Sequence, residues 1–574
     1  MSGNTFLSMS RQELQAKGIT RPDVILVSGD AYIDSSYSGV AIIGRVLESA
    51  GYSVGIIAQP DISGPQDITC LGEPLLFWGV TSGCVDSEIA NYTALGKPRR
   101  SCDFTPGTRN SKRPDRASIT YSNLIRRYFK KTVPIVLGGI EASLRRVAHY
   151  DHRTDRIRRS ILLDSKADIL VYGMGEKSVL EIAARLDQNV GLDDIPGTCV
   201  MSRQAPDNYL RLPDFEKTEK DPLIFARMFR LFYLNSLAPT GQGMVQKYDS
   251  RYLVHHPPAP YLTRTELDRV HELPFMNDAH PRCKLGGEIK ALETIKDSIT
   301  THRGCYGECS FCSIAVHQGR SVISRSMDSI VREAGRLART DGFSGTIKDV
   351  GGPTANMYGS GCKRMFRGEP CRDKRCTGYH GVCPELVPGH NKQKRLLTKL
   401  RSLPGVKKVN IASGIRYDLV LADKKHGPDY LEQIIRNHVS GQMKIAPEHS
   451  AEHVLELMNK PRASMSLEFA KLYRGLARRF NKNIYLSCYV IAAHPGCSLK
   501  DMIDFEAFAR KSLKMMHEQV QIFTPAPSTR STVMYHAGVD PFTGKKVWSE
   551  KSVTGKKMQK DANQKQEKCK PGRD

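Results

Sequence analysis

The sequence predicts an α/β protein with two main parts: a Rossmann-like domain over residues 1–200 and a partial (β/α)6 TIM-type barrel over residues 288–535. Three observations predict this fold. The chain has 574 residues, which is too long for one compact core. Short, continuously apolar runs alternate with helical patterns, as in parallel sheets that are buried on both faces. The alternation stops near residue 200 and restarts at residue 288.

Apolar runs predict the strands of the first domain. They are DVILVS at 23–28, SVGIIA at 53–58, PLLFWGV at 74–80, VPIVLGG at 133–139 and ADILVYGMGE at 167–176. Ligands of such sheets bind beyond the carboxyl ends of the strands. Seven polar residues near these ends can line a pocket as a set, although a solvated charge is the simpler interpretation of each: Asp30, Asp34, Glu141, Arg145, Arg146, His149 and Asp151.

Two further segments carry weaker patterns. Residues 201–287 are irregular and rich in Pro, Tyr and charge, so we expect a connector that contains one amphipathic helix at 221–237. Residues 536–574 form a basic tail whose composition predicts disorder.

From residue 288, apolar runs and helical patterns alternate again in about six β/α units. The strands after the first are predicted at 344–352, 406–414, 442–448, 484–496 and 518–527. A Cys-rich insertion, residues 355–390, interrupts this order after the second strand. In such barrels the chemistry lies at the carboxyl-terminal ends of the strands.

The segment RGCYGECSFC, residues 303–312, follows the first of these strands and holds Cys305, Cys309 and Cys312. Three thiolates in one loop can bind three corners of a [4Fe–4S] cube and leave the fourth iron open. Zinc is the competing ligand, although structural zinc usually binds paired C-x2-C hooks. The chain has 15 cysteines and no secretory signal, so we expect reduced thiols and a cytoplasmic protein rather than a disulfide framework.

The spacing C-x3-C-x-Φ-C, with Phe311 as the aromatic residue, resembles the signature of radical S-adenosylmethionine (SAM) enzymes. The resemblance implies that the open iron chelates SAM and that one electron, from a donor such as flavodoxin or ferredoxin, yields a 5′-deoxyadenosyl radical. It also implies that SAM is bound by Phe311 and by residues after later strands, namely Gly351, Gly352, Pro353, Ser413, Arg416, Lys444 and Glu448. Pro353 replaces the Glu of the usual Gly-Gly-Glu motif, which favours contact through backbone carbonyls.

Longer stretches identify the chain as a member of the YgiQ-type radical SAM protein family. They include VLGGIEASLRRVAHYD, DVGGPTANMYG, IASGIRYD and KIAPEHS, and the resemblance runs from about residue 20 to 550. It implies a first domain similar to cobalamin-binding domains. The loop at 29–34 lacks the histidine that ligates cobalt in those domains, which argues against cobalamin with such a lower ligand and leaves binding without it open. The resemblance implies no particular substrate.

A second group of thiols, Cys362, Cys371, Cys376 and Cys383, lies in the insertion. Four cysteines so close together predict a second metal site. An auxiliary iron–sulfur cluster and a zinc site with four cysteine ligands are both open, and His380 can replace one ligand.

The formal net charge of +25 is compatible with a nucleic acid partner and equally with none. No apolar run is long enough to span a membrane. We therefore expect a radical SAM enzyme acting on an unidentified substrate. Two alternatives stay open: a methylthiotransferase or methyltransferase acting on RNA or protein, and a zinc-binding interaction protein without catalysis.

Overall fold

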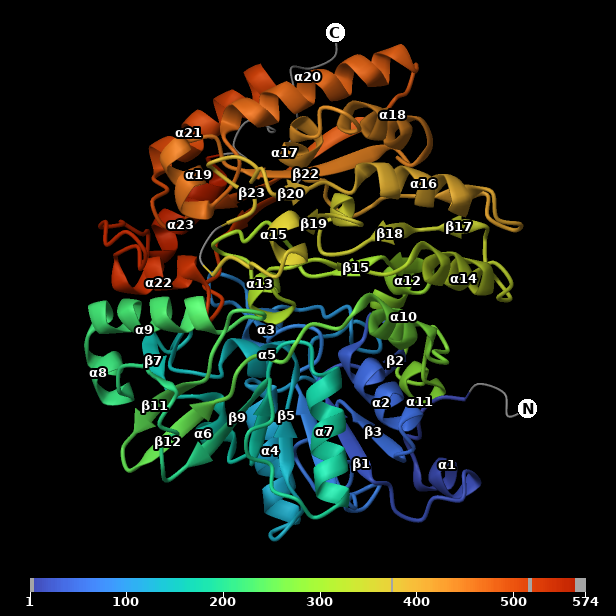
Figure 1. Ribbon diagram of the computed structural model, residues 1–574, viewed down its shortest axis with the longest axis vertical. Coiled ribbons are helices and arrows are strands. Elements are labelled where there is room, and N and C mark those ends of the chain that lie inside the picture. Colours follow the sequence, from blue (N-terminus) through green and yellow to red (C-terminus); the bar gives the residue numbers. More distant parts are fainter. Residues whose placement is uncertain (1–4, 373–374, 515–518, 563–574) are drawn as a thin grey trace. The chain divides into compact units, whose positions relative to one another are not determined.

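The computed structural model describes residues 5–372, 375–514 and 519–562 and divides into two compact units. Unit 1 comprises Met1–Lys296 with the short segments Val316–Gly319 and Ala526–Ser528, and unit 2 comprises the rest of the chain. Each unit combines helices with parallel strands (Figure 1), so both are α/β as predicted.

Unit 1 is built on one nine-stranded sheet with the order β10-β11-β12-β9-β8-β5-β4-β1-β3. Its parallel part has the flavodoxin-like order, in which β1 lies between β3 and β4. All five residues of β1 are buried, because helices cover both faces of such a sheet. The parallel strands are β1 (Val24–Ser28), β3 (Val54–Ala58), β4 (Phe77–Thr81), β5 (Ile135–Leu137) and β8 (Ile169–Val171).

Helices α2 (Gly39–Ser49) and α7 (Glu176–Asp187) pack against each other, and so do α4 (Ala117–Tyr128) and α6 (Ile161–Ser165). Figure 1 shows α7 in front of the sheet. The other helices of this unit are α1 (Arg11–Ala16), α3 (Ser87–Asn91), α5 (Gly139–Leu144), α8 (Phe215–Lys220), α9 (Pro222–Asn235), α10 (Arg264–Glu272), α11 (Pro281–Lys284) and α12 (Ala291–Ile295). Two short strand pairs complete it: β2 (Ile33–Asp34) with β13 (Asp278–Ala279), and β6 (His149–Asp151) with β7 (Arg156–Arg158).

The expected connector, 201–287, is instead part of the sheet of unit 1. β9 (Thr198–Ser202), β12 (Arg251–His255) and β11 (Met244–Tyr248) pair antiparallel in succession, and the edge strand β10 (Leu210–Arg211) is parallel to β11. The exposed Lys247 and Arg251 interrupt the apolar pattern of the hairpin, so it was not recognised in a search for continuous apolar runs. The amphipathic helix predicted at 221–237 is present as α9.

Within the described residues, the parallel strands of unit 2 follow the order of the predicted (β/α)6 partial barrel, with β17 and β18 both lying in the second predicted strand. β14 pairs with β18, β17 with β21, and β22, β23 and β24 form one sheet. A parallel bridge between Ile415 and Ile445 joins the third strand segment to the fourth. The bounds are β14 (Ser298–Thr300), β17 (Thr346–Ile347), β18 (Asp349–Gly351), β21 (Lys408–Val409), β22 (Gln442–Glu448), β23 (Tyr485–Ala492) and β24 (Gln519–Ile522).

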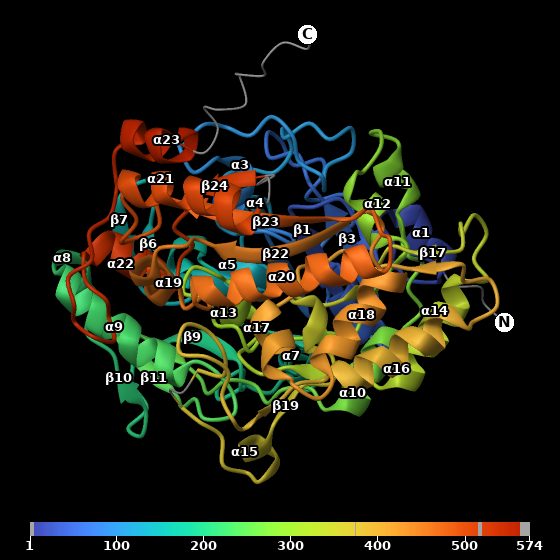
Figure 2. The same cartoon turned by 90° about the horizontal axis from the view of Figure 1, so that it is seen from above.

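Helices surround these strands, and Figure 2 shows β22, β23 and β24 side by side. The helices are α13 (Ile314–His317, which crosses into unit 1), α14 (Met327–Leu337), α15 (Lys363–Phe366), α16 (His390–Arg401), α17 (Tyr417–Ala422), α18 (Gly427–Asn437), α19 (Glu452–Met458), α20 (Ala463–Arg479), α21 (Leu499–Phe508), α22 (Arg530–Ala537) and α23 (Val553–Asp561). Short turns η1 (Ala355–Met357) and η2 (Ala509–Leu513) and the hairpins β15 (His302–Arg303) with β16 (Ile323–Ser324) and β19 (Gly361–Cys362) with β20 (Leu386–Val387) complete the unit.

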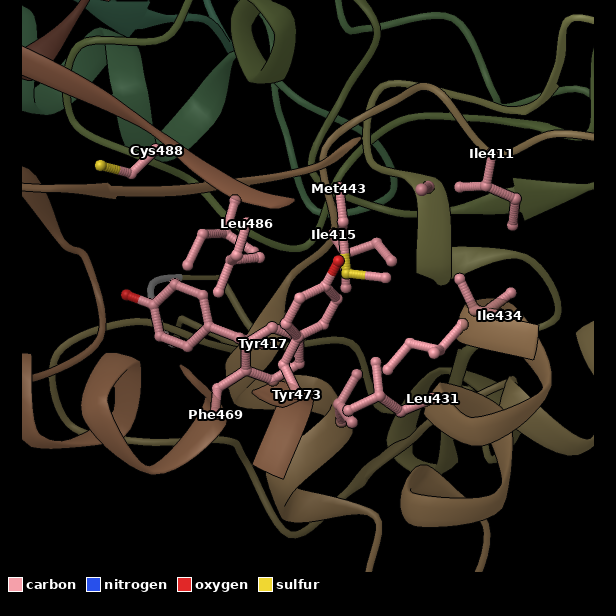
Figure 3. Packing of buried hydrophobic residues seen from close by; sticks show 14 of the residues in the cluster. Ile411, Ile415, Tyr417, Leu431, Ile434, Met443, Phe469, Tyr473, Leu486 and Cys488 are labelled. Carbon is pink, nitrogen blue, oxygen red and sulfur yellow. The ribbon is translucent and has the colours of Figure 1, made fainter. Parts of the chain in front are cut away.

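The core of unit 2 lies between the strands and α17, α18 and α20 (Figure 3). Tyr417 lies with its ring centroid 6.0 Å from that of Phe469, and Ile445 and Ile434 are fully buried. Burial of each such side chain contributes about 1.5–3 kcal/mol to stability. The apolar strand residues that predicted the barrel are the ones that form this core.

The predicted disorder of the tail is wrong for its described part, because α22 ends at Ala537 and α23 follows. Polar contacts hold α23: Gln559 Oε1 accepts the Ala493 N–H at 2.8 Å, and Gln559 Nε2 donates to the Cys497 carbonyl at 3.0 Å. The amino-acid composition of the tail indicates how little apolar surface it can bury, but it does not reveal hydrogen bonds such as those of Gln559. Residues 563–574 of the predicted tail lie outside the described residues.

Candidate functional site

The loop with Cys305, Cys309 and Cys312 begins directly after β15, near the carboxyl end of the first barrel strand. Asn459, just after α19, holds this loop: its Nδ2 donates to the carbonyls of Gly307 (3.1 Å) and Glu308 (3.2 Å). Asn459 has the left-handed backbone conformation common at helix ends, with φ of 54°. The loop is thus fixed by a residue far along the chain.

The three thiols of the loop are free and close enough to influence one another electrostatically. Burial, and next the charge of Cys309, raise the pKa of the Cys312 thiol to about 12. Burial also raises the pKa of Cys305, whose sulfur accepts the Gly307 N–H at 3.3 Å. In the chain alone these buried thiols are therefore protonated at neutral pH.

Two buried cations lie beside the thiols. Arg416 Nη1 is 3.8 Å from the sulfur of Cys309, and its other nitrogens bind Asp418 at 2.5 and 2.8 Å. Burial, the largest single influence, lowers the pKa of Arg416, but the charge and hydrogen bonds of Asp418, together with the nearby Cys309 and Cys305, outweigh burial and raise the pKa. Lys460 Nζ lies 3.5 Å from Glu448 Oε1. Positive charge is thus placed where deprotonated thiols need it.

The predicted residues after the second and third strands also lie together. Gly351 and Ser413 are neighbours, since a Cβ on Gly351 would lie 3.3 Å from Ser413 Oγ. The Ser413 hydroxyl donates to Asp349, and the Gly351 carbonyl accepts the Thr301 N–H at 2.7 Å. A Cβ on Gly352 would lie only 2.6 Å from the His302 ring, so this position requires glycine for space. Pro353 follows, half-buried.

Residues predicted after the fourth strand differ in their surroundings. Glu448 is buried and paired with Lys460; burial raises its pKa, although Lys460 opposes this. Lys444 is half-buried, and its carbonyl accepts the Ile415 N–H at 3.1 Å. Phe311 packs edge-to-face on His494, with ring centroids 6.1 Å apart. The structure therefore gathers the cysteines with Arg416, Glu448 and Phe311, while Lys444 is placed by its backbone.

The second thiol group forms a neighbouring cluster. The Cys383 N–H donates to the Cys376 carbonyl at 2.8 Å, and Cys362 pairs with Leu386 across the β19–β20 hairpin. Burial, with the charges of Glu308 and the other three thiols, raises the pKa of Cys376 to about 12. His380 is exposed, with its side chain 79% accessible and 3.9 Å from Glu456.

Within the described ranges, no three His, Cys, Asp or Glu side chains converge on the position of one metal ion. This concerns a single ion; in an iron–sulfur cube each cysteine binds its own iron, so the sulfurs lie further apart. In the same part of the chain, every helix is too short or too polar to cross a membrane.

The polar residues at the strand ends of unit 1 are mostly paired with one another. Asp30 pairs with Arg113, Asp34 with Arg45, and Arg145 with Asp86 at 2.8 Å and Asp151 at 3.4 Å. Glu141 accepts the Ser87 and Ser118 N–H groups, and His149 lies 3.4 Å from Arg145. Arg146 packs against the rings of Tyr172 and Phe232. These side chains are buried, so they support the fold rather than line an open pocket.

Sequence reasoning missed three residues of the site: Asn459, Lys460 and Asp418. Asn459 and Lys460 follow a helix, where Asn is common for backbone reasons alone. Asp418 lies two residues after Arg416, and this proximity is the one feature of the sequence that could have indicated an ion pair between them.

Residues 6–298 match the family described as Radical SAM N-terminal. The chain is 49% identical to a UPF0313 protein of Fusobacterium nucleatum, covering 97% of this chain and 98% of the relative. It is 46% identical to a UPF0313 protein of Thermotoga maritima (97% and 98%) and 44% identical to one of Methanosarcina acetivorans (98% and 78%).

Two solved structures share the fold. One is the radical SAM methyltransferase TsrM of Kitasatospora setae with cobalamin and a [4Fe–4S] cluster bound: 14% identity, TM-score 0.51, 89% of this chain and 77% of that one. The other is the cobalamin-dependent SAM radical enzyme OxsB with aqua-cobalamin bound: 11% identity, TM-score 0.50, 87% and 53%. Both structures contain cobalamin, which counts against the expectation, drawn from the lack of a histidine at 29–34, that cobalamin is doubtful in this fold. At these identities the likeness shows the fold alone.

Proposed function

Because this chain belongs to the UPF0313 family and carries a Radical SAM N-terminal domain, we propose that it cleaves SAM reductively and uses the radical to modify a substrate. The observation that carries this proposal is the loop of three free thiols after the first barrel strand, with Arg416 beside Cys309. The substrate is not specified by any residue described above.

The residues fit a [4Fe–4S] cluster. Cys305, Cys309 and Cys312 offer soft thiolate ligands, which iron–sulfur clusters prefer. Arg416 and Lys460 offset the negative charge that develops when the thiols lose their protons. Three cysteine ligands would leave one iron of the cluster open for SAM. A cluster held by these residues would supply the electron for reductive cleavage of SAM.

The chain's own residues bind SAM and orient it. Gly351 and Gly352 allow close approach because they carry no side chain. The Ser413 oxygen, whose proton is directed to Asp349, is free to accept a hydrogen bond from the ribose. Glu448 and Lys460 offer a paired carboxylate and ammonium for the methionyl end. Phe311 forms an apolar wall that excludes water from the radical.

The test is SAM cleavage under anaerobic conditions. We expect the protein, reconstituted with iron and sulfide and reduced with dithionite, to form 5′-deoxyadenosine and methionine. Cys309→Ala should abolish both products, and Cys70→Ser, which removes an exposed thiol in unit 1, should leave them unchanged. Undiminished cleavage by Cys309→Ala would refute the proposal. Bound zinc without iron would favour a non-catalytic zinc protein.

The same reaction, run with SAM that carries a deuterated methyl group, distinguishes methyl transfer from hydrogen abstraction. A methyltransferase or methylthiotransferase moves the label into RNA or protein, whereas a hydrogen-abstracting enzyme leaves it in methionine. The basic charge motivates RNA as a probe, and binding that is unchanged between low and moderate salt would exclude an electrostatic RNA site.

The residues described in unit 1 do not provide an axial ligand for cobalamin. The point between β1 and β4, where this fold binds ligands, is filled by Asp30, Arg113 and Gln59, and the loop at 29–34 has no histidine. We therefore derive no step through cobalamin. Incubation with hydroxocobalamin, followed by gel filtration and absorbance of the protein fraction, tests whether it binds without such a ligand.

A further inference from the structure

The insertion after β18 folds into a compact structure that carries four thiols. Cys362 ends β19, and Cys383 lies three residues before Leu386 of β20, its partner strand. The Cys383 N–H donates to the Cys376 carbonyl at 2.8 Å, and the Leu386 N–H donates to the Cys383 carbonyl at 3.0 Å. Cys371 lies on the loop between these strands. Backbone pairing therefore brings both ends of the insertion together around its cysteines.

The thiols face a partly apolar environment next to the first cysteine loop. Cys376, Cys383 and Cys305 pack against the same small core, formed by Tyr306, Val322, Met357, Leu386 and Leu419. All four thiols of the insertion are free, and none is fully exposed. Soft, partly buried thiols without a disulfide partner are typical ligands of a metal centre.

Hydrogen bonds brace the insertion on the first loop. Thr377, next to Cys376, accepts a bond from Arg416 Nη2 at 2.5 Å through its hydroxyl and one from Asn459 Nδ2 at 3.3 Å through its carbonyl. The same Arg416 contacts Cys309, and the same Asn459 holds Gly307. Two side chains therefore fix both thiol groups at once.

We propose that Cys362, Cys371, Cys376 and Cys383 ligate a second [4Fe–4S] cluster. Four protein thiolates complete the ligand set, so this cluster has no open iron and does not bind SAM. Within the described residues, no three such side chains are placed to hold one metal ion, whereas zinc needs all four sulfurs about 2.3 Å from one centre. A cube gives each cysteine its own iron, so it does not require that convergence.

The insertion also carries the charge that such a cluster requires. Its basic residues are Lys363, Arg364, Arg367, Arg372, Lys374 and Arg375, against the acids Glu369, Asp373 and Glu385. Arg367 pairs with Glu369 at 3.7 Å and with Glu385 at 3.4 Å. The remaining excess of positive charge favours the thiolate forms that bind iron.

The deciding experiment removes the first site. The variant Cys305→Ala/Cys309→Ala/Cys312→Ala is purified anaerobically, reconstituted, and analysed for iron, sulfide and zinc and by Mössbauer spectroscopy. We expect about four iron and four sulfide per chain with a cubane spectrum, and about eight iron in the unsubstituted protein. A triple variant without iron, or with one zinc per chain, would overturn the second cluster.

The reciprocal variant Cys376→Ala/Cys383→Ala should keep about four iron, and Cys70→Ser should keep about eight. If the double variant does not fold, as judged by circular dichroism, the triple variant still decides. Cleavage of SAM by an unsubstituted protein that holds only about four iron would defeat the second cluster alone. If the triple variant holds about four iron but the unsubstituted protein does not cleave SAM, the proposed function is wrong and the second cluster is supported.

Discussion

The Nη1 atom of Arg416 lies 3.8 Å from the sulfur of Cys309, while the same guanidinium is paired with the buried carboxylate of Asp418. One cation thus serves both an internal ion pair and the thiol loop. Since it is buried, its charge acts with little screening by water.

Replacement of Arg416 by Met should destabilise unit 2 by about 3–5 kcal/mol, because it leaves the Asp418 charge buried and unpaired. Arg416→Met/Asp418→Asn should recover part of this loss in urea unfolding, yet still retain less iron than the unsubstituted protein. Arg395→Met removes an exposed arginine on α16 and should leave the iron content unchanged and the free energy of unfolding within about 0.5 kcal/mol. Full iron retention by the double variant would show that Arg416 matters only for its ion pair.

Asn459→Gly isolates the side chain of Asn459, because glycine adopts the same left-handed backbone without strain. It removes the hydrogen bonds to Gly307, Glu308 and Thr377, each worth about 1 kcal/mol. We expect faster loss of iron on exposure to air, measured by the decay of cluster absorbance. Asn481→Gly alters an exposed residue with the same left-handed backbone and serves as the control. Equal decay in both variants would contradict the bracing role.

Gly352→Ala should impair SAM binding, because the new Cβ would lie 2.6 Å from the His302 ring and 2.8 Å from its carbonyl. Such overpacking costs about 1–3 kcal/mol. Gly414→Ala is the matched control, since its nearest neighbour would be 3.9 Å away. Isothermal titration with SAM should show roughly tenfold weaker binding for the first variant and little change for the second. Equal affinities would place SAM away from this strand end.

The pH dependence of stability should reflect His494. Burial lowers its pKa to about 3, its Nδ1 donates to the Pro495 carbonyl and its Nε2 accepts from Ser531. The folded state needs the neutral ring, so its contribution is present above the unfolded pKa near 6.5 and is lost as pH falls toward 3.

Urea unfolding of the unsubstituted protein between about pH 6.5 and 4 should therefore lose about 1.4 kcal/mol per pH unit from this histidine. His494→Gln removes that part of the slope. His380→Gln alters a ring that is 79% accessible and serves as the control. An unaltered slope in His494→Gln would exclude His494 as its source.

Gln559→Ala should weaken the attachment of α23, because two hydrogen bonds to residues 493 and 497 are lost. We expect a decrease in the free energy of unfolding of about 1–3 kcal/mol. Lys557→Ala alters an exposed neighbour on the same helix and should change it by less than about 0.5 kcal/mol. Similar values for both variants would show that α23 is not held by Gln559.

The sequence was informative where the chain is apolar on both sides. The segment DVILVS, predicted as a strand at 23–28, contains β1, all five of whose residues are buried, because a continuous apolar run is stable as a strand covered on both faces. The thiol loop was likewise apparent from its spacing alone. Neither pattern depends on contacts between distant segments.

The parts that could not be predicted depend on such contacts. Asn459 holds the thiol loop although about 150 residues separate them, and no local pattern marks it. Charged residues interrupt the apolar pattern of the β11–β12 hairpin, and α23 is held by hydrogen bonds of the Gln559 amide. Asp30 was expected to line a pocket, but it is buried in an ion pair with Arg113, about 80 residues away in the sequence.

The docking of α23 on the end of β23 has a consequence for biosynthesis. A chain emerges from the ribosome with its amino-terminal end first, so the loop of Cys305 is made long before Gln559. The turn at 493–497, which holds His494 against Phe311, receives its hydrogen bonds to Gln559 only after that residue has been synthesised. A chain terminated before Gln559 would carry the three thiols without this support, which ties formation of the site to synthesis of a segment about 250 residues further along the chain.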